Sequence, residues 1–236
     1  MNKPTSLLGG VMVPMVTPLD DNDQLNEEGL RIYTEWLIEQ RVQALYPCSG
    51  CGEFWKLTES ERKTVAEIVI QTAAGRVPVL PGSGGGSTRE AIYWTQHALD
   101  SGADGVVIET MTALEEVKAA IEASKKVGDL IVMATMTFDK GPRGYFTMMG
   151  VTPEQAASKL KTAGADILGS NCGNGILNMI DIAVQLREVT DNHLLIHSNA
   201  GIPEIRKGQI VYPETPEWMA GKLLSLVEGG VSIVGG

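Results

Sequence analysis

Residues Ala165–Gly175 have the sequence A-D-I-L-G-S-N-C-G-N-G, and the interpretation of the whole chain starts from this stretch. Its apolar run indicates a short buried strand that ends at Asn171-Cys172 and passes into a glycine-rich turn. An α/β barrel carries its chemistry at the carboxyl ends of its strands. Cys172 is therefore a candidate functional thiol, and the question is which partners the rest of the sequence provides for it.

On both sides of this stretch the chain repeats a strand followed by a helix. The predicted strands are Gly10–Thr17, Val42–Pro47, Val77–Gly82, Gly105–Glu109, Leu130–Phe138, Asp166–Asn171, His193–Asn199 and Val231–Val234. The predicted helices are Asn26–Gln40, Thr58–Ala74, Ser87–Ser101, Leu114–Val127, Thr152–Ala163, Leu177–Val189 and Pro216–Glu228. The third helix begins with Ser87-Thr88-Arg89-Glu90, which has the pattern of a capping box.

Near-continuous apolar strands that alternate with helices are typical of a parallel sheet buried on both faces. The sequence therefore predicts an α/β fold, with residues 1–236 forming a single (β/α)8 TIM barrel. A doubly wound open sheet is the alternative, but Thr17-Pro18-Leu19-Asp20 lacks the glycine-rich phosphate turn typical of that fold. Because the sequence stops after the eighth strand, we expect the final helix to be missing. The N-terminal segment or a second subunit would then cover that strand, which makes a homo-oligomer a candidate assembly.

Composition narrows the classes of partner. The formal charge of −10 and the pI near 4.8 argue against nucleic acid and anionic membrane surfaces, which repel an acidic protein. No apolar run approaches the roughly 18 residues of a membrane span, and Met1–Gly10 lacks the pattern of a signal peptide. We therefore expect a cytoplasmic protein whose three cysteines are free thiols or metal ligands.

Three weaker patterns also lie near strand ends. Cys48 and Cys51 form a C-x-x-C pair without the further ligands of a zinc site or the setting of a redox pair, so incidental thiols are the favoured interpretation. The glycine run Gly82–Gly86 suits either a phosphate cradle or a flexible connection. Among the histidines, His97 lies in a predicted helix and His193 at the very start of a predicted strand, whereas His197 lies within that strand and could face the barrel interior.

Residues 9–107 resemble the dihydrodipicolinate synthase and N-acetylneuraminate lyase family. The matching pieces are V-P-M-V-T-P at Val13–Pro18, S-G-C-G-E at Ser49–Glu53, Leu57-Thr58 with Glu61-Arg62, and V-P-V-L-P-G at Val77–Gly82. This resemblance implies a Schiff base between a keto acid and a lysine on the sixth strand, assisted by a tyrosine after the fourth. Here the sixth strand is Asp166–Asn171 and the fourth ends at Glu109-Thr110-Met111, so both catalytic residues are absent.

From about residue 102 onward, the chain is similar to the zinc-dependent homocysteine S-methyltransferases. The similarity rests on G-A-D-G-V-V-I-E-T at Gly102–Thr110, M-T-F-D at Met136–Asp139, G-A-D-I-L-G-S-N-C at Gly164–Cys172, S-N-A-G-I-P at Ser198–Pro203, V-Y-P at Val211–Pro213 and V-S-I-V-G-G at Val231–Gly236. It implies that Cys172 is a zinc thiolate and that Glu109, Asp139, Asn171 and Asn199 bind a small thiol or amino acid. Zinc would stabilise the substrate thiolate, which takes a methyl group from a corrinoid or another methyl donor.

The sequence departs from this second family at its end, because the family's other two zinc thiolates follow the final Gly-Gly and the sequence stops at Gly235-Gly236. One thiolate does not make a zinc site. We expect a hybrid or engineered chimera of two barrel families, joined near Ala103–Ile108, with an incomplete zinc site and little or no methyl-transfer activity. The alternatives are a working methyltransferase domain truncated before its Cys-Cys ligands, and a Schiff-base aldolase relative that lacks its lysine.

Overall fold

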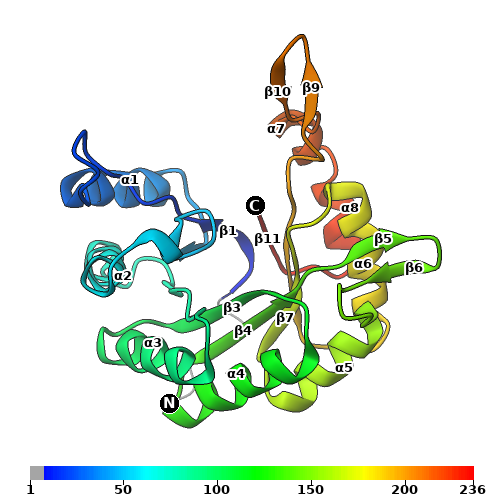
Figure 1. The fold of residues 1–236 in the computed structure, drawn as a ribbon, viewed down its shortest axis with the longest axis horizontal. Coiled ribbons are helices and arrows are strands. Elements are labelled where there is room, and N and C mark those ends of the chain that lie inside the picture. The colour runs from blue at the N-terminus through cyan, green and yellow to red at the C-terminus, as the bar shows by residue number, and fades with distance from the viewer. Residues whose placement is uncertain (1–7) are drawn as a thin grey trace. The chain divides into compact units, whose positions relative to one another are not determined.

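A computed structural model describes residues 8–236, and its elements alternate between strands and helices as the sequence predicts (Figure 1). The sheet strands are β1 (Gly10–Pro14), β2 (Ala44–Tyr46), β3 (Gly105–Met111), β4 (Ile131–Met136), β7 (Ile167–Asn171), β8 (His193–His197) and β11 (Ile233–Gly235). They form one seven-stranded sheet in the order β2-β1-β11-β8-β7-β4-β3, and the described pairings are parallel. The fold is therefore α/β with a parallel sheet. The segment Met1–Gly10, for which we expect no export signal, begins outside the described residues.

The helices and the hairpins complete the list of elements. The helices are α1 (Glu27–Glu39), the 3-10 turn η2 (Phe54–Lys56), α2 (Glu59–Ala73), α3 (Thr88–Asp100), α4 (Leu114–Val127), α5 (Pro153–Ala163), α6 (Ile176–Arg187), α7 (Pro216–Ala220) and α8 (Leu223–Glu228). Two antiparallel hairpins stand outside the sheet, β5 (Asp139–Gly141) with β6 (Gly144–Phe146) and β9 (Glu204–Arg206) with β10 (Gln209–Val211). No helix within residues 8–236 is both long and apolar enough to cross a membrane.

The chain divides into two compact units. The first consists of Met1–Ile108 and Glu122–Met133, and the second of Glu109–Ile121 and Ala134–Gly236. In the first unit, β1 and β2 pair in register from Met12 opposite Ala44. Helices α1 and α2 bury their apolar faces against this pair in a core that contains Leu30, Leu37, Leu45, Val65, Val69 and Val79. Burial of this kind supplies most of the stability of such a layer.

In the second unit, β7 lies between β4 and β8, and every residue of β7 is buried. The register places Asn171 at the end of β7 directly opposite His197 at the end of β8. Opposed residues of parallel strands point to the same face, so these two side chains share one side of the sheet. Helices α5 and α6 bury Leu160, Met179 and Leu186, which fixes the strand ends in place.

The predicted strand Val77–Gly82 is wrong as a regular strand. Only isolated bridges form there, from Val79 to Leu45 and from Gly82 to Val107. The sequence V-P-V-L-P-G places Pro78 and Pro81 in this segment, and proline has no N–H to donate to a ladder. The segment therefore follows the sheet without completing a ladder on either side.

The predicted helix Pro216–Glu228 is also wrong as a single helix. It divides into α7 and α8 around Gly221, which caps α7, and glycine is a poor helix former. The predicted capping box at Ser87 forms by half: Ser87 accepts from the N–H of Glu90, whereas the Glu90 carboxylate accepts from the N–H of Gly86. Complete capping boxes occur instead at Thr58 with Glu61 and at Thr152 with Gln155.

Candidate functional site

The side chain of Asn171 is the centre of the polar network at the end of β7. It is buried, and its Oδ1 accepts from the N–H of Thr110 at 2.9 Å and from Oγ1 of Thr135 at 2.6 Å. Its Nδ2 donates to Oγ1 of Thr110 at 2.7 Å and to Sγ of Cys172 at 3.2 Å. The amide group therefore uses both its donor and its acceptor capacity within the second unit.

Two residues beside this network have left-handed backbone conformations. Thr110 has φ of 60° and Cys172 has φ of 59°, although neither is glycine. A β-branched residue rarely adopts this region, and such strain costs roughly 1–3 kcal/mol at a site that holds it in place. The paired hydrogen bonds between Thr110 and Asn171 provide part of that hold.

The thiol of Cys172 is half-buried. Burial, followed by the negative charge of Glu109, raises the pKa of Cys172, while hydrogen bonds from Asn171 and Thr110 act in the opposite direction. The net direction favours the protonated thiol in the metal-free chain. Within residues 8–236, no three His, Cys, Asp or Glu side chains lie close enough together to hold a metal ion. The residues present therefore do not fit the zinc ion that the sequence resemblance implies.

The structure brings only some of the predicted ligand-binding residues together. Asn171 and Cys172 are in direct contact, and the half-buried Glu109 precedes Thr110 on β3. Asp139 is exposed, and its Oδ1 lies 3.7 Å from the position that a Cβ on Gly173 would take. Asn199 is exposed as well; its N–H donates to the carbonyl of Asn174 at 3.1 Å, and its carbonyl accepts from Oγ of Ser198 at 3.0 Å. The roles of these residues in binding stay predictions.

Sequence reasoning missed the threonines that surround Asn171. Thr135 lies in β4, and Thr137, two residues later, donates its hydroxyl to the carbonyl of Asn171 at 2.9 Å. The available signal was the alternation M-A-T-M-T-F at the end of that strand, since residues two apart share a face. Thr110 gives no comparable signal, because its contact with Asn171 spans 61 residues.

The glycine-rich turn after Cys172 is tied to its surroundings by hydrogen bonds. Nδ2 of Asn174 donates to the carbonyl of Phe138 at 2.5 Å, and the first N–H of α6, from Ile176, donates to Oε2 of Glu214 at 2.8 Å. A Cβ on Gly175 would lie 2.0 Å from Oε1 of Glu214, so a larger residue there would require the Glu214 carboxylate to shift away from the N–H of Ile176. Glu214 thus caps a helix that has no side-chain cap of its own, and the negative carboxylate suits the positive helix end.

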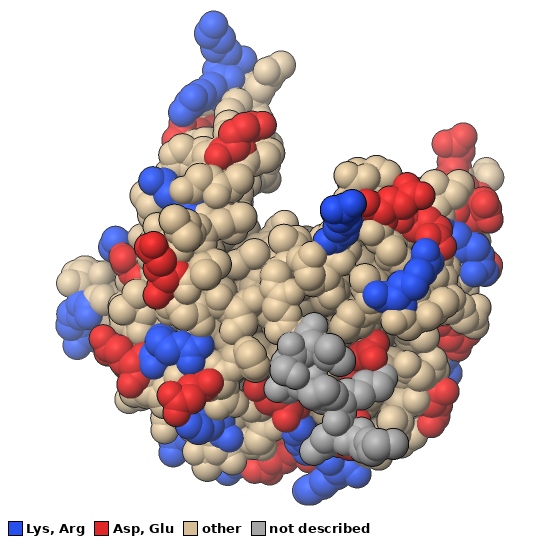
Figure 2. Space-filling view, turned by 180° about the vertical axis from the view of Figure 1, so that it is seen from behind, with Lys and Arg blue, Asp and Glu red and all other residues tan. Residues whose placement is uncertain are grey.

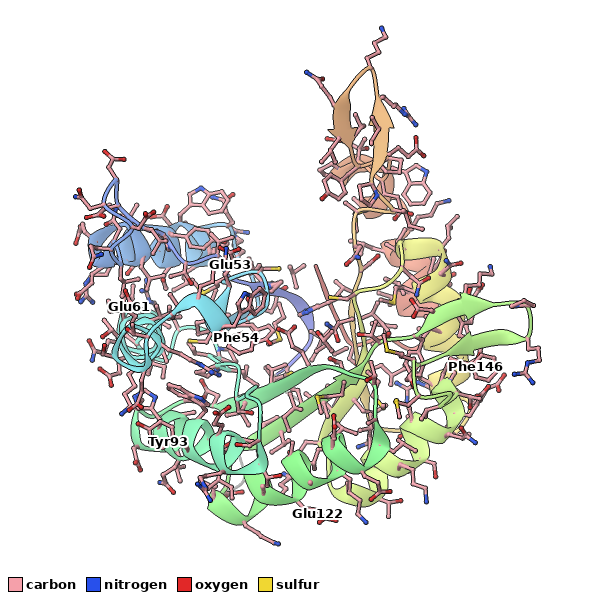
Figure 3. All side chains as sticks on the ribbon, viewed as in Figure 1. Glu53, Phe54, Glu61, Tyr93, Glu122 and Phe146 are labelled. Carbon is pink, nitrogen blue, oxygen red and sulfur yellow. The ribbon has the colours of Figure 1, made fainter. Side chains whose placement is uncertain are left out.

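The C-x-x-C pair in the first unit does not form a joint site. Cys48 is buried, donates weakly to the carbonyl of Arg62 at 3.5 Å, and has its pKa raised to about 11, chiefly by burial. Cys51 is exposed. Figure 3 shows Glu53 and Phe54 in the loop that follows this pair and Glu61 at the start of α2. The interpretation of these cysteines as incidental thiols stays a prediction.

The glycine run is bound by protein groups. One terminal nitrogen of Arg62 donates to the carbonyls of Gly82 and Gly84, each at 2.8 Å, and the guanidinium lies 4.6 Å from the Phe54 ring and 4.0 Å from the Trp94 ring. The N–H of Gly86 already donates to Glu90 at 2.6 Å. Hydrogen bonds from Arg62 thus hold two carbonyls of this run, and a carboxylate of the chain itself accepts one N–H that a phosphate cradle could use.

Two family models match the chain. Residues 87–236, more than half of the chain, match the family described as Homocysteine S-methyltransferase. Residues 7–110 match the Dihydrodipicolinate synthetase family. The two matches overlap at residues 87–110, which includes the segment where we predicted the join.

Two similar curated proteins each match less than half of the chain. The 4-hydroxy-tetrahydrodipicolinate synthase of Rhizobium meliloti is 46% identical over 99 residues, which are 42% of this chain and 34% of that protein. The enzyme of the same name from Nitratidesulfovibrio vulgaris is 43% identical over 101 residues, 43% of this chain and 34% of that protein. The chain thus spans about a third of the length of the curated relatives it matches.

Solved structures resemble almost the whole chain. An N-acetylneuraminate lyase from Mycoplasma synoviae has a TM-score of 0.72 at 17% identity and covers 98% of this chain and 70% of its own. The 4-hydroxy-tetrahydrodipicolinate synthase from Methylacidiphilum fumariolicum SolV has a TM-score of 0.71 at 18% identity, over 97% of this chain and 68% of its own. At such identity the likeness establishes the fold alone.

These comparisons correct the main functional expectation. We expected a barrel whose function derives from methyl transfer to a small thiol, and that expectation is wrong. The curated relatives and the structural neighbours are dihydrodipicolinate synthases and N-acetylneuraminate lyases, which point to the Schiff-base aldolase class. The chain agrees better with the alternative of an aldolase relative without its lysine.

Proposed function

The chain belongs to the homocysteine S-methyltransferase family through residues 87–236, yet its curated relatives and structural neighbours are aldolases, and from these premises we propose a carbonyl-binding function. The proposed activity is reversible, non-covalent binding of a small 2-oxo acid at the carboxyl ends of the strands in the second unit. The proposal keeps the ligand class that the aldolase resemblance implies and drops the covalent step.

The observation that carries the proposal is the identity of the residue at the end of β7. The resemblance implies a lysine on this strand, but β7 is I-L-G-S-N and contains no amine. Asn171 ends the strand, and its amide is held by Thr110 and Thr135. A Schiff base needs a primary amine that attacks the carbonyl carbon and eliminates water, and an amide nitrogen does not do this.

Tyr145, a tyrosine of the second unit, does not replace the assisting tyrosine. Tyr145 on β6 donates to Oδ2 of Asp181 at 2.9 Å and to Oδ1 of Asn178 at 3.0 Å, and so ties the hairpin to α6. Burial, followed by its hydrogen bond to Asp181, raises the pKa of Tyr145 to about 12. Such a tyrosine stays protonated and structural at neutral pH, so proton relay through it is not part of the proposal.

The polar groups that remain suit hydrogen bonding to an oxo acid. Asn171 and Thr137 already use their donors within the network, so the groups that can turn to a ligand are the hydroxyl of the exposed Thr110 and the thiol of the half-buried Cys172. Neutral donors of this kind bind a carbonyl or carboxylate oxygen for roughly 0.5–3 kcal/mol each, which corresponds to weak, reversible binding. We therefore expect dissociation constants for pyruvate nearer to about 1 mM than to 1 µM.

Two measurements on the same sample test the proposal. Pyruvate binding is followed by ligand-observed NMR, and covalent trapping is followed by mass spectrometry after borohydride reduction. We expect saturable binding without an adduct, and weaker binding after Asn171→Ala. Asn192→Ala is the matched control, because Asn192 bonds to the carbonyl of Ala165 before β7 begins. A borohydride-trapped adduct would overturn the non-covalent step, and no saturable binding would overturn the function.

Two finer features of the fold belong to the same proposal. We infer that the sheet closes as a (β/α)8 barrel, because Val79 and Gly82 bridge to β2 and to β3, the two ends of the strand order. We also infer that the chain joins parts of two barrel families near Ala103–Ile108, which lies within the overlap of the two family matches. A natural gene that encodes this junction without interruption would contradict an engineered origin.

A further inference from the structure

The hairpin β9–β10 is short, polar on one face and apolar on the other. Ile205 and Ile210 are directly opposite each other, and their exposed fractions are 82% and 71%. Tyr212, two residues beyond Ile210 and therefore on the same face, is 56% exposed. Figure 1 shows the hairpin extending beyond α7, and Figure 2 shows basic side chains at its tip. Exposed apolar residues gathered on one face of a strand pair indicate a contact surface.

The turn of this hairpin determines which backbone groups are directed outward. Lys207 and Gly208 have φ of 52° and 79°, as a two-residue type I′ turn requires, and Arg206 is opposite Gln209. Because antiparallel pairs alternate between bonded and non-bonded positions, Arg206 with Gln209 closes the ladder and Ile205 is a non-bonded position. The N–H and C=O of Ile205 therefore point away from β10. Among the described residues, β9 pairs only with β10, so this edge is open.

The sequence of the open edge is complementary to itself. If two copies of β9 pair antiparallel about Ile205, the two Ile205 residues exchange both backbone hydrogen bonds. Glu204 of each copy then stands opposite Arg206 of the other, and the four charges form two attractive pairs. The isoleucines of both hairpins would form one row across four strands. Pairing β10 in the same way would bring together no charged residues, since its residues are Gln209, Ile210 and Val211.

We propose that β9 is a dimerisation edge, at which two copies of this chain form a continuous four-stranded sheet with Ile205 on the two-fold axis. The occupant is a second copy because the edge matches itself in register and in charge. This surface differs from the face of Val231–Val234, through which we predicted an oligomer from the sequence. Since a hairpin buries less than the roughly 1,200 Å² of a standard interface, we expect a weak, concentration-dependent dimer.

Charge reversal tests the register directly. Glu204→Arg makes each cross-strand pair Arg against Arg, and Arg206→Glu makes each pair Glu against Glu. In the native chain, Arg206 Nε lies 2.9 Å from Glu204 Oε2 and forms an ion pair within one hairpin strand. The double variant exchanges these two charges, so it keeps an ion pair within the strand and restores two attractive pairs between the copies. The control Glu217→Arg changes charge equally on α7, outside the edge.

The measurement is sedimentation equilibrium over a concentration series up to about 1 mM, which covers weak association. We expect the native chain, the double variant and the control to approach twice the 25.3-kDa chain mass. Each single variant should dimerise at least about tenfold more weakly. An equimolar mixture of the two single variants should recover association, because the two arginines of one chain would face the two glutamates of the other in the mixed dimer. A native chain that stays monomeric throughout, or association unaffected by the single reversals, would overturn the proposal.

Discussion

The clearest test of the polar network is Asn171→Ala. The substitution removes the acceptor for Oγ1 of Thr135, a buried hydroxyl, and for the N–H of Thr110. A buried donor left without a partner costs roughly 1–3 kcal/mol, whereas Thr110 is exposed and its N–H can turn to water at lower cost. The substitution also removes the two hydrogen bonds that hold Thr110 in its strained backbone conformation. Together, we expect these effects to lower the free energy of unfolding by about 2–4 kcal/mol.

The assay is urea denaturation at pH 7, in which the midpoint shifts while the slope m stays constant. Asn199→Ala is the matched control, because it removes the same atoms from an exposed asparagine at the same edge and should change stability by less than about 0.5 kcal/mol. A loss below about 1 kcal/mol for Asn171→Ala would refute the reasoning, since it would mean that the Thr135 hydroxyl finds another partner at no cost.

Three further outcomes follow from single groups. Burial raises the pKa of Cys48 in the folded chain from 9.0 to about 11, so the folded state holds the thiol proton more tightly than the unfolded state does. This preference for the protonated thiol contributes fully to stability below pH 9 and is lost as the pH rises to 11. Between these pH values, the free energy of unfolding should fall more steeply in the native chain than in Cys48→Ala. Since burial and the charge of Glu109 raise the pKa of Cys172, iodoacetamide should alkylate it more slowly than the exposed Cys51 at pH 8, and rapid alkylation would contradict this. Because no three potential metal ligands lie together within residues 8–236, elemental analysis should find no equivalent of zinc, and bound zinc would contradict that reasoning. Gly175→Ala should cost about 1–3 kcal/mol because its Cβ meets Glu214, and thermal melting of the double variant with Glu214→Ala should recover part of that loss.

The sequence was sufficient where local chemistry determines the structure. Apolar runs located β1, β4, β7 and β8, and helical periodicity located the long helices to within a few residues. It was insufficient where one residue type opposes the pattern around it. Pro78 and Pro81 interrupt an apolar run that otherwise predicts a strand, and Gly221 interrupts a helix. Proline removes the backbone N–H that a strand ladder needs, and glycine makes the backbone too flexible to favour a helix.

The hairpins were missed for a different reason. The segment E-I-R-K-G-Q-I-V contains two three-residue strands around Lys207-Gly208, which are shorter than the runs on which periodicity depends. The glycine after a lysine was the available turn signal. Likewise, the end of β7 was identified as a site, but the partners of Asn171 were not. Thr110 and Thr135 lie 61 and 36 residues away, and only the folded sheet brings them to one place.

The position of the network also limits what the aldolase resemblance can explain. That match ends at residue 110, whereas Thr135, Thr137, Asn171 and Cys172 all lie beyond it, in the part that belongs to the methyltransferase family. A binding function of the aldolase class must therefore come from the position of these side chains at the strand ends, not from inherited catalytic residues. Stability and binding then become separable. If Asn171→Ala lowers stability and leaves pyruvate binding unchanged, the network supports the fold alone; if both fall together, the edge that stabilises the fold also contacts the ligand.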